Sequence, residues 1–296
     1  MQEKLNEFLD GLKHERGLSV NTLVAYRRDL AQYINFLNDE AGCHLWSQVT
    51  EVDVMKYLYW LKDKGSAPAT LARKAAAVRG FHRFLLRNHQ TDRDPSYAME
   101  VPKVEQKLPQ ILSVSAVETL LGAPDEETES GCRDRAMLEL LYATGMRVSE
   151  LVLLDLDDLN LSMGFVRCST GKGSERVIPL GRQARQTMKT YITEVRKRVN
   201  GFQDEQALFL NRQGRRITRQ GFWKLLKQYA RQTGIGESLS PETLRHSLEA
   251  HMLENGADPE SVEELMGRMD KLASQRYPRP AKQRLKDVYA RFHPRA

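Results

Sequence analysis

The chain has 296 residues, of which 28% are charged and 41% hydrophobic, and it carries a formal net charge of +6. That length favours two ordinary domains over one large one, and the composition excludes wholesale disorder. The basic balance, with a pI of about 9.1, favours an anionic partner, and nucleic acid is the commonest one.

The cysteines and the N-terminus exclude further classes. Cys43, Cys132 and Cys168 are far apart, odd in number and in no C-x-x-C spacing, so neither a disulfide framework nor a zinc site is indicated. The N-terminus is charged throughout, and the sequence contains no run of about eighteen apolar residues. We therefore expect a cytoplasmic protein that is neither exported nor inserted in a membrane.

The first hundred residues are predicted to form an all-helical domain, residues 1–100. Apolar side chains recur there at three- and four-residue steps in four segments. Gly17 is predicted to end the first helix and Ser19 to cap the second. Thr50 is predicted to cap the third helix, and Pro68 to open the fourth. No convincing strand pattern interrupts this series.

The polar faces of the second and fourth predicted helices are rich in cations. Between Arg73 and Arg87 there is no aspartate or glutamate at all. Such a face is either a solvated surface or a contact for the phosphates of DNA, and the sequence leaves both open. The residues that we take as candidate DNA contacts are Arg27, Arg28, Arg73, Lys74 and Arg79.

A segment rich in proline and poor in apolar periodicity follows, and we interpret residues 101–111 as a linker. Residues 112–296 then form a second domain, which is again mainly helical. Its first helix is predicted to be capped by Ser115, and a strongly apolar helix is predicted to end at Gly145.

One clear β pattern occurs in this second domain. Residues that favour strands gather around Val166 and again at Val177 and Ile178, on either side of a Gly-rich stretch. This pattern predicts an antiparallel hairpin with Lys172 near its tip. A lysine there is usually a solvated turn residue, although its flexible flanks would also let it reach a bound substrate.

Three further side chains are candidates for chemistry, each with an ordinary alternative. Arg147 lies where one helix gives way to the next, and a cation there is often only a helix-end residue. Arg245, in PETLRHS, follows an acid by three residues on one helix face, as in a surface ion pair. Tyr277, in SQRYPRP, has no obvious core face. Singly, none of these signals identifies a function.

Together and in this order, these residues and the motifs around them resemble the tyrosine recombinase (phage integrase) family, and within it the Xer recombinases. The motifs include LYATGMRVSELVLLDLDDLNL, TGKGSERVIPLG and TLRHSLEAHMLENGADPESVEELMG, and the resemblance covers essentially the whole chain. It implies a mainly α fold. A helical core-binding (SAM-like) domain would precede a mixed, mostly helical catalytic domain with a small antiparallel β-sheet.

The resemblance also implies a reaction. Arg147 and Arg245 match two arginines that offer bidentate donor forks to the scissile phosphate. Tyr277 matches the nucleophile that forms a 3′-phosphotyrosyl bond and releases a 5′-hydroxyl. Lys172 matches the lysine that protonates the leaving oxygen. Neither a metal nor a nucleotide cofactor is required.

Three positions depart from the family pattern. Glu242 stands where the family has histidine, and Arg268 stands where it has histidine or tryptophan. A carboxylate about 4–5 Å from the scissile phosphate would be repelled by roughly 3–4 kcal/mol at an effective dielectric near 20. We hypothesise that Arg268 pairs with Glu242 and neutralises it, and we count both as candidate site residues. Pro278 also disfavours helical geometry at Tyr277.

The partners implied by the resemblance are duplex DNA, a homo- or hetero-tetramer with a second recombinase, and a DNA translocase acting in chromosome dimer resolution. The C-terminal helix has an apolar stripe that includes Leu285 and Val288. It either packs on its own domain or docks on a neighbouring protomer as an exchange helix, which the resemblance favours. One rival function is a cleavage-impaired accessory DNA-binding subunit, and another is a type IB topoisomerase.

Overall fold

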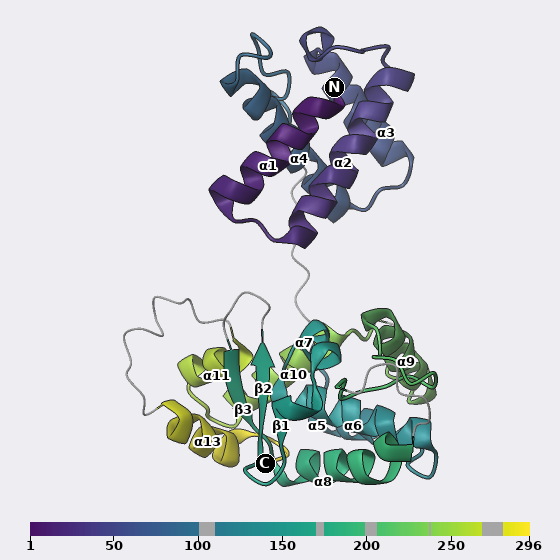
Figure 1. Cartoon of the computed structure of the whole chain (residues 1–296), viewed down its shortest axis with the longest axis vertical. Coiled ribbons are helices and arrows are strands. Elements are labelled where there is room, and N and C mark those ends of the chain that lie inside the picture. Colours follow the sequence, from purple (N-terminus) through teal and green to yellow (C-terminus); the bar gives the residue numbers. More distant parts are fainter. Residues whose placement is uncertain (101–109, 170–174, 199–205, 237, 268–280) are drawn as a thin grey trace. The chain divides into compact units, whose positions relative to one another are not determined.

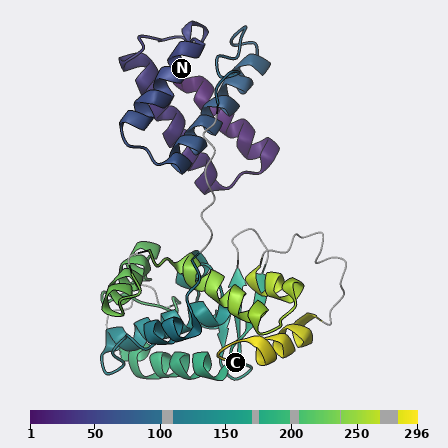
Figure 2. The ribbon, with the colours of Figure 1, turned by 180° about the vertical axis from the view of Figure 1, so that it is seen from behind.

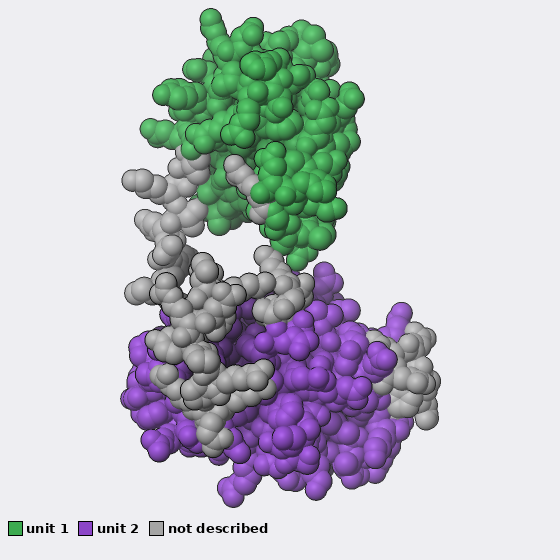
Figure 3. All heavy atoms as spheres, turned by 60° about the vertical axis from the view of Figure 1, so that its left-hand side comes forward, with its two compact units in different colours: residues 1–107 green, residues 108–296 purple. Residues whose placement is uncertain are grey.

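The computed structural model describes residues 1–100, 110–169, 175–198, 206–236, 238–267 and 281–296. The chain forms two compact units, Met1–Lys107 and Leu108–Ala296, which Figure 3 shows in separate colours. Both are built mainly from helices, and the second also contains a small antiparallel sheet, so the predicted fold class is confirmed. Most of the segment interpreted as a linker lies outside the described residues.

The first unit is helical throughout its described elements (Figure 1). Gly17 ends the first helix with φ 56°, the Ser19 side chain accepts the Thr22 N–H, and Thr50 caps the third helix, as predicted. The elements are α1 (Gln2–Arg16), α2 (Val20–Asp39), a 3₁₀ turn (Trp46–Gln48), α3 (Glu51–Asp63) and α4 (Pro68–Arg87).

Aromatic side chains form the centre of this first unit and hold α2 against α4. The ring centroids of Tyr33 and Tyr57 lie 4.8 Å apart, as do those of Trp46 and Phe81. The hydroxyl of Tyr33, on α2, forms a 2.9 Å hydrogen bond with Nε2 of the fully buried His82, on α4. Close packing and this buried hydrogen bond fix the two helices that carry the candidate DNA contacts.

The second unit surrounds α6 (Glu129–Thr144), which is buried on nearly all sides. The preceding α5 (Val114–Leu121) is capped by Ser113, whose side chain accepts the Ala116 N–H, so the prediction of Ser115 as the cap is wrong by two residues. Two serines of the same kind lie on either side of the helix start, and the local pattern does not separate them. Within the described ranges, no helix is long and apolar enough to cross a membrane.

The remaining elements of the second unit follow in the order shown in Figure 1. They are α7 (Val148–Leu153), a 3₁₀ turn (Leu156–Asp158), β1 (Leu159–Asn160), β2 (Phe165–Ser169), β3 (Glu175–Pro179), α8 (Arg182–Thr190), a π-helical turn (Tyr191–Val195), a 3₁₀ turn (Arg196–Arg198), α9 (Arg219–Gln232), α10 (Pro241–Glu254), α11 (Pro259–Met266) and α13 (Ala281–Phe292).

The sheet has the order β1-β2-β3 and is antiparallel. Val166 pairs with Ile178, and Cys168 with Arg176, so the predicted hairpin is confirmed. Strand β1 was not predicted, because two residues are too few for an alternation pattern. Helices α10 and α11 lie behind the sheet in Figure 1 and in front of it in Figure 2. The hairpin tip with Lys172 lies outside the described residues.

Helix α13 packs on its own unit. Leu285, Val288 and Tyr289 are buried, and the Tyr289 hydroxyl accepts the Gly181 N–H at 3.2 Å. Beyond the helix, Arg295 donates two hydrogen bonds, of 2.6 and 3.1 Å, to the fully buried Glu139 carboxylate. In the single chain the apolar stripe thus takes the intramolecular alternative, and docking on a neighbouring protomer stays a prediction.

Candidate functional site

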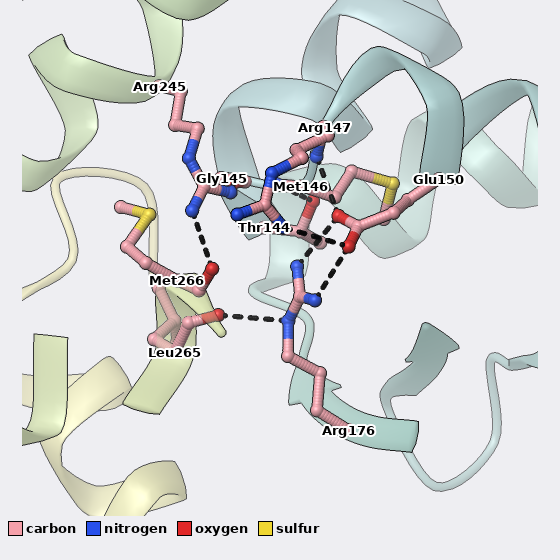
Figure 4. A network of polar contacts seen from close by, with 9 residues as sticks. All are labelled: Thr144, Gly145, Met146, Arg147, Glu150, Arg176, Arg245, Leu265 and Met266. Atoms are coloured by element: carbon pink, nitrogen blue, oxygen red, sulfur yellow. Dashed lines mark hydrogen bonds and ion pairs between the residues drawn. The ribbon is translucent and has the colours of Figure 1, made fainter. Parts of the chain in front are cut away.

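Arg147 and Arg245 come together at the turn between α6 and α7 (Figure 4). Gly145 ends α6 in the left-handed conformation, with φ 56°, and Arg147 becomes the N-cap of α7. From α10, Arg245 donates one hydrogen bond to the Gly145 carbonyl and another, of 2.5 Å, to the Met266 carbonyl at the end of α11. Residues 100 positions apart thus meet at one turn.

The conformation of this turn requires glycine, which leads to a stability prediction. A Cβ on Gly145 would lie 2.7 Å from the Met266 sulfur and 3.1 Å from Leu248 Cδ2. At Gly234, which also has positive φ, no described atom outside its immediate neighbours lies within 4 Å of the added Cβ. Gly234→Ala is expected to cost only the left-handed strain, about 1–2 kcal/mol. Gly145→Ala adds overpacking of about 1–3 kcal/mol.

Chemical denaturation of the two full-length variants checks this expectation. The wild-type chain supplies the reference free energy of unfolding for both. Equal losses of stability in Gly145→Ala and Gly234→Ala would contradict the crowding around the turn.

The buried carboxylate of Glu150 binds both Arg147 and Arg176, and it was not among the site residues predicted from the sequence. Glu150 is 5% exposed, and its Oε2 accepts the Arg147 backbone N–H at 2.7 Å. Arg176, on β3, donates to Oε1 at 2.8 Å and to Oε2 at 2.9 Å. An acid three residues after a helix start is the capping-box signal that would have indicated its bond to the backbone.

The charge of Glu150 is stabilised where it lies. Burial alone would raise its pKa, but the hydrogen bonds and charge of Arg176, followed by those of Arg147, hold the pKa of Glu150 below its usual range. The carboxylate is therefore ionised at neutral pH. Three arginines and one carboxylate leave this network, comprising Arg147, Glu150, Arg176 and Arg245, with an excess of positive charge suited to a phosphate.

The two predicted arginines differ in accessibility. The Arg147 side chain is 42% exposed, and its Nη1 lies 3.4 Å from Glu150 Oε1, a weak contact that leaves the guanidinium open to solvent. Arg245 is 2% exposed and is bound to main-chain carbonyls. Arg147 can thus bind an anion without rearrangement, whereas Arg245 contacts the same turn from the protein interior.

The other predicted site residues are placed only in part. Glu242 is exposed in the first turn of α10, three residues before Arg245. Solvent around an exposed carboxylate screens the repulsion expected between Glu242 and a phosphate. Lys172, Arg268 and Tyr277 lie outside the described residues. Among the described residues, no group of three or more histidine, cysteine or acidic side chains could hold a metal ion.

The predicted DNA contacts of the first unit are mostly engaged within that unit. Arg27 donates to Asn6 Oδ1 at 2.7 Å, and Arg73 forms an ion pair with Asp29. Lys74 donates to the Gln32 side chain, Arg79 donates to the Met99 carbonyl, and Arg28 is exposed. A DNA phosphate would have to share or replace these partners.

Helix α9 carries a second cationic surface, which was not among the DNA contacts predicted from the sequence. Trp223 is 44% exposed, and the Lys227 ammonium lies 5.2 Å from its ring centroid. Lys224, Lys227 and Arg231 line a surface hollow beside Trp223. The helix contains no acidic residue, and this absence is the signal that could have identified it.

Comparisons with known proteins found matches along the whole chain. Residues 110–284 match the Phage integrase family, and residues 5–89 match the "Phage integrase, N-terminal SAM-like domain". The chain is 46% identical to "Tyrosine recombinase XerD" of Oceanobacillus iheyensis over 298 residues, which cover 100% of both chains. It is 44% identical to the XerD recombinase of Staphylococcus epidermidis over 297 residues, again covering both chains fully.

Solved structures share the fold. An integrase of the transposon Tn1549, in complex with circular intermediate DNA, matches with a TM-score of 0.73 and 17% identity, over 95% of this chain and 98% of that one. XerH site-specific recombinase, bound to a palindromic difH substrate, matches with a TM-score of 0.69 and 20% identity, over 98% and 89% of the two chains.

Proposed function

The chain belongs to the phage integrase family of tyrosine recombinases, and we propose that it cuts and rejoins duplex DNA through a 3′-phosphotyrosyl intermediate. The observation that carries this proposal is the meeting of Arg147 and Arg245 at one turn, with the Arg147 guanidinium open to solvent. A planar donor fork there suits the non-bridging oxygens of a phosphodiester.

The proposed roles follow from the charges that develop during cleavage. Arg147 and Arg245 stabilise the extra negative charge on the phosphorus as it becomes five-coordinate. The Tyr277 hydroxyl attacks the phosphorus and gives up its proton to water, the bond to the 5′ oxygen breaks, and Lys172 gives that oxygen its proton. The phosphotyrosyl bond keeps the energy needed for rejoining. Because Arg245 is 2% exposed, its contact with a phosphate requires the residues that cover it to move when DNA binds.

DNA would be held by both units. The cations of α2 and α4 serve the first unit, where Arg27 and Arg28 are both exposed and Arg73 forms an ion pair with Asp29. In the second unit, the basic face of α9 around Trp223 is the further contact. We propose a tetramer on DNA with a second recombinase, and a DNA translocase as partner. Chromosome dimer resolution in the cytoplasm is the process that this assembly would serve.

A nicked substrate tests the proposal. A bound duplex is first selected from a random pool, and a nick is then placed near the cleavage point so that the short released strand diffuses away. We expect wild-type protein to form a DNA adduct that survives denaturation. Tight binding without any adduct would favour the accessory subunit, and relaxation of supercoiled plasmid by the monomer would favour the topoisomerase.

Glu242 and Arg268 are proposed to act as a neutral pair, which predicts coupled effects. Arg268→His alone leaves the Glu242 carboxylate uncompensated near the phosphate, so it is expected to slow cleavage by about tenfold or more, whereas Glu242→His alone leaves only a cation there and is not expected to slow it. The double variant, with two neutral side chains, is expected to recover most of that loss. Single-turnover cleavage of the nicked substrate measures all three variants, and additive losses would count against the pair.

A further inference from the structure

We propose that Arg176 is a positioning residue, which holds Glu150 and the end of α11 so that Arg147 and Arg245 face the DNA phosphate. This inference rests on the proposed function and adds a residue that touches neither DNA nor the reacting atoms. Its basis is a set of contacts that join three segments of the second unit at one guanidinium (Figure 4).

The contacts of Arg176 use its donor fork and its Nε. The fork donates to both oxygens of Glu150, at 2.8 and 2.9 Å, and Nε donates to the Leu265 carbonyl at 3.2 Å. Leu265 directly precedes Met266, whose carbonyl accepts from Arg245 at 2.5 Å. Arg176 and Arg245 thus bind two consecutive carbonyls in the last turn of α11. A displacement of Arg176 would therefore disturb the positions of both the Arg147 and the Arg245 side chains.

The charges explain why Glu150 needs this partner. Glu150 is buried and contacts two arginines, but it binds Arg176 closely and the Arg147 side chain only at 3.4 Å. Without Arg176, the buried carboxylate would have Arg147 as its near cation, and an unpaired buried charge is costly. Glu150 would then draw Arg147 into a close pair and away from the phosphate. Arg176 therefore keeps Arg147 available.

Gly267 shows how closely the chain approaches this guanidinium. It caps α11 with φ 64°, and a Cβ there would lie 2.7 Å from Arg176 Nη1 and 3.0 Å from its Cζ. A larger residue at this position would have to displace the arginine. The end of α11 thus packs closely against the Arg176 side chain, which extends from strand β3.

The test uses Arg176→Met, which removes the guanidinium and its charge but keeps an unbranched flexible chain, and Arg176→Lys, which keeps the charge. Arg133→Met is the matched control, since Arg133 is 14% exposed against 13% for Arg176. Its guanidinium also binds a carboxylate, Asp134, and a distant carbonyl, that of Leu210. Single-turnover cleavage of the nicked duplex, DNA affinity and unfolding are measured for each full-length variant.

We expect Arg176→Met to slow cleavage by about a hundredfold, the loss typical of a misplaced catalytic group, while DNA affinity falls only by the contribution of the one phosphate at the cleavage position. Arg176→Lys should recover part of that loss, and Arg133→Met should lower stability without slowing cleavage. The double variant Glu150→Gln with Arg176→Met should cleave faster than Arg176→Met alone, because no carboxylate then captures Arg147. Wild-type rates in Arg176→Met, equal losses in Arg133→Met, or no relief by Glu150→Gln would each overturn the proposal.

A binding measurement separates this inference from the proposed reaction. The affinity for the selected duplex is compared with that for the same duplex with an uncharged methylphosphonate at the cleavage position. Wild-type protein should prefer the phosphate, and Arg176→Met should lose most of that preference. This result without any adduct would defeat the cleavage proposal and leave the role of Arg176 standing. An unchanged preference in Arg176→Met, or none in the wild type, would overturn the role of Arg176.

Discussion

Replacement of Tyr277 by phenylalanine is expected to abolish the denaturation-resistant DNA adduct while leaving DNA affinity unchanged. The substitution removes one hydroxyl oxygen and keeps the ring, so the only atom lost is the proposed nucleophile. Phenylalanine cannot attack phosphorus, and no partial activity is expected through this residue. The measurement is adduct formation on the nicked duplex, resolved under denaturing conditions, with binding followed in parallel.

A matched control distinguishes the nucleophile from tyrosines that merely support the fold. Tyr289→Phe removes a hydroxyl that accepts the Gly181 N–H, within the buried contact of α13. Its expected effect is a loss of stability of about 1 kcal/mol, with the adduct still formed. Adduct formation by Tyr277→Phe at the wild-type level would show that another residue attacks the DNA.

Arg245→Lys is expected to have the second large effect, which is a fall in the cleavage rate of about 10²–10³-fold. A lysine keeps the charge, but its compact ammonium cannot replace a planar fork that holds the Gly145 and Met266 carbonyls and, in the proposed reaction, also faces a phosphate. Two buried carbonyls would lose their donor, so we also expect a loss of stability of about 1–3 kcal/mol. Single-turnover cleavage and chemical denaturation measure the two losses separately.

Arg196→Lys is the control for the structural part of this loss. Arg196 is also buried, and its Nε and Nη2 donate to the Ala207 carbonyl at 3.0 and 2.9 Å, away from the turn at Gly145. It should reproduce the loss of stability without the fall in rate. Parallel losses of rate in Arg196→Lys and Arg245→Lys would mean that Arg245 acts only through the fold.

Sequence-local chemistry made the helix boundaries predictable. Gly17 and Gly145 adopt the left-handed conformation that glycine accepts without strain, and Ser19 and Thr50 cap with their own side chains. These signals depend on a few neighbouring residues. The error at the start of α5, where Ser113 rather than Ser115 caps, arose where two equivalent side chains competed within three residues.

The candidate site was predictable only where a motif marked it. Arg147 and Arg245 came from the family resemblance, and the structure places both at the turn after α6. Glu150 and Arg176 were missed because their pairing joins α7 to β3 across 26 residues of sequence. The roles of Lys172 and Tyr277 rest on the resemblance alone, since neither lies within the described residues.

The amino-acid sequence by itself determined the helices, the hairpin and the family, because these depend on local periodicity, capping and ordered motifs. Tertiary structure alone decided that Arg147 is open to solvent while Arg245 is buried, and that Glu150 is shared between Arg147 and Arg176. The physical reason is that burial and ion pairing are set by which distant segments pack together. Such packing is a property of the folded chain and leaves no trace at any single position.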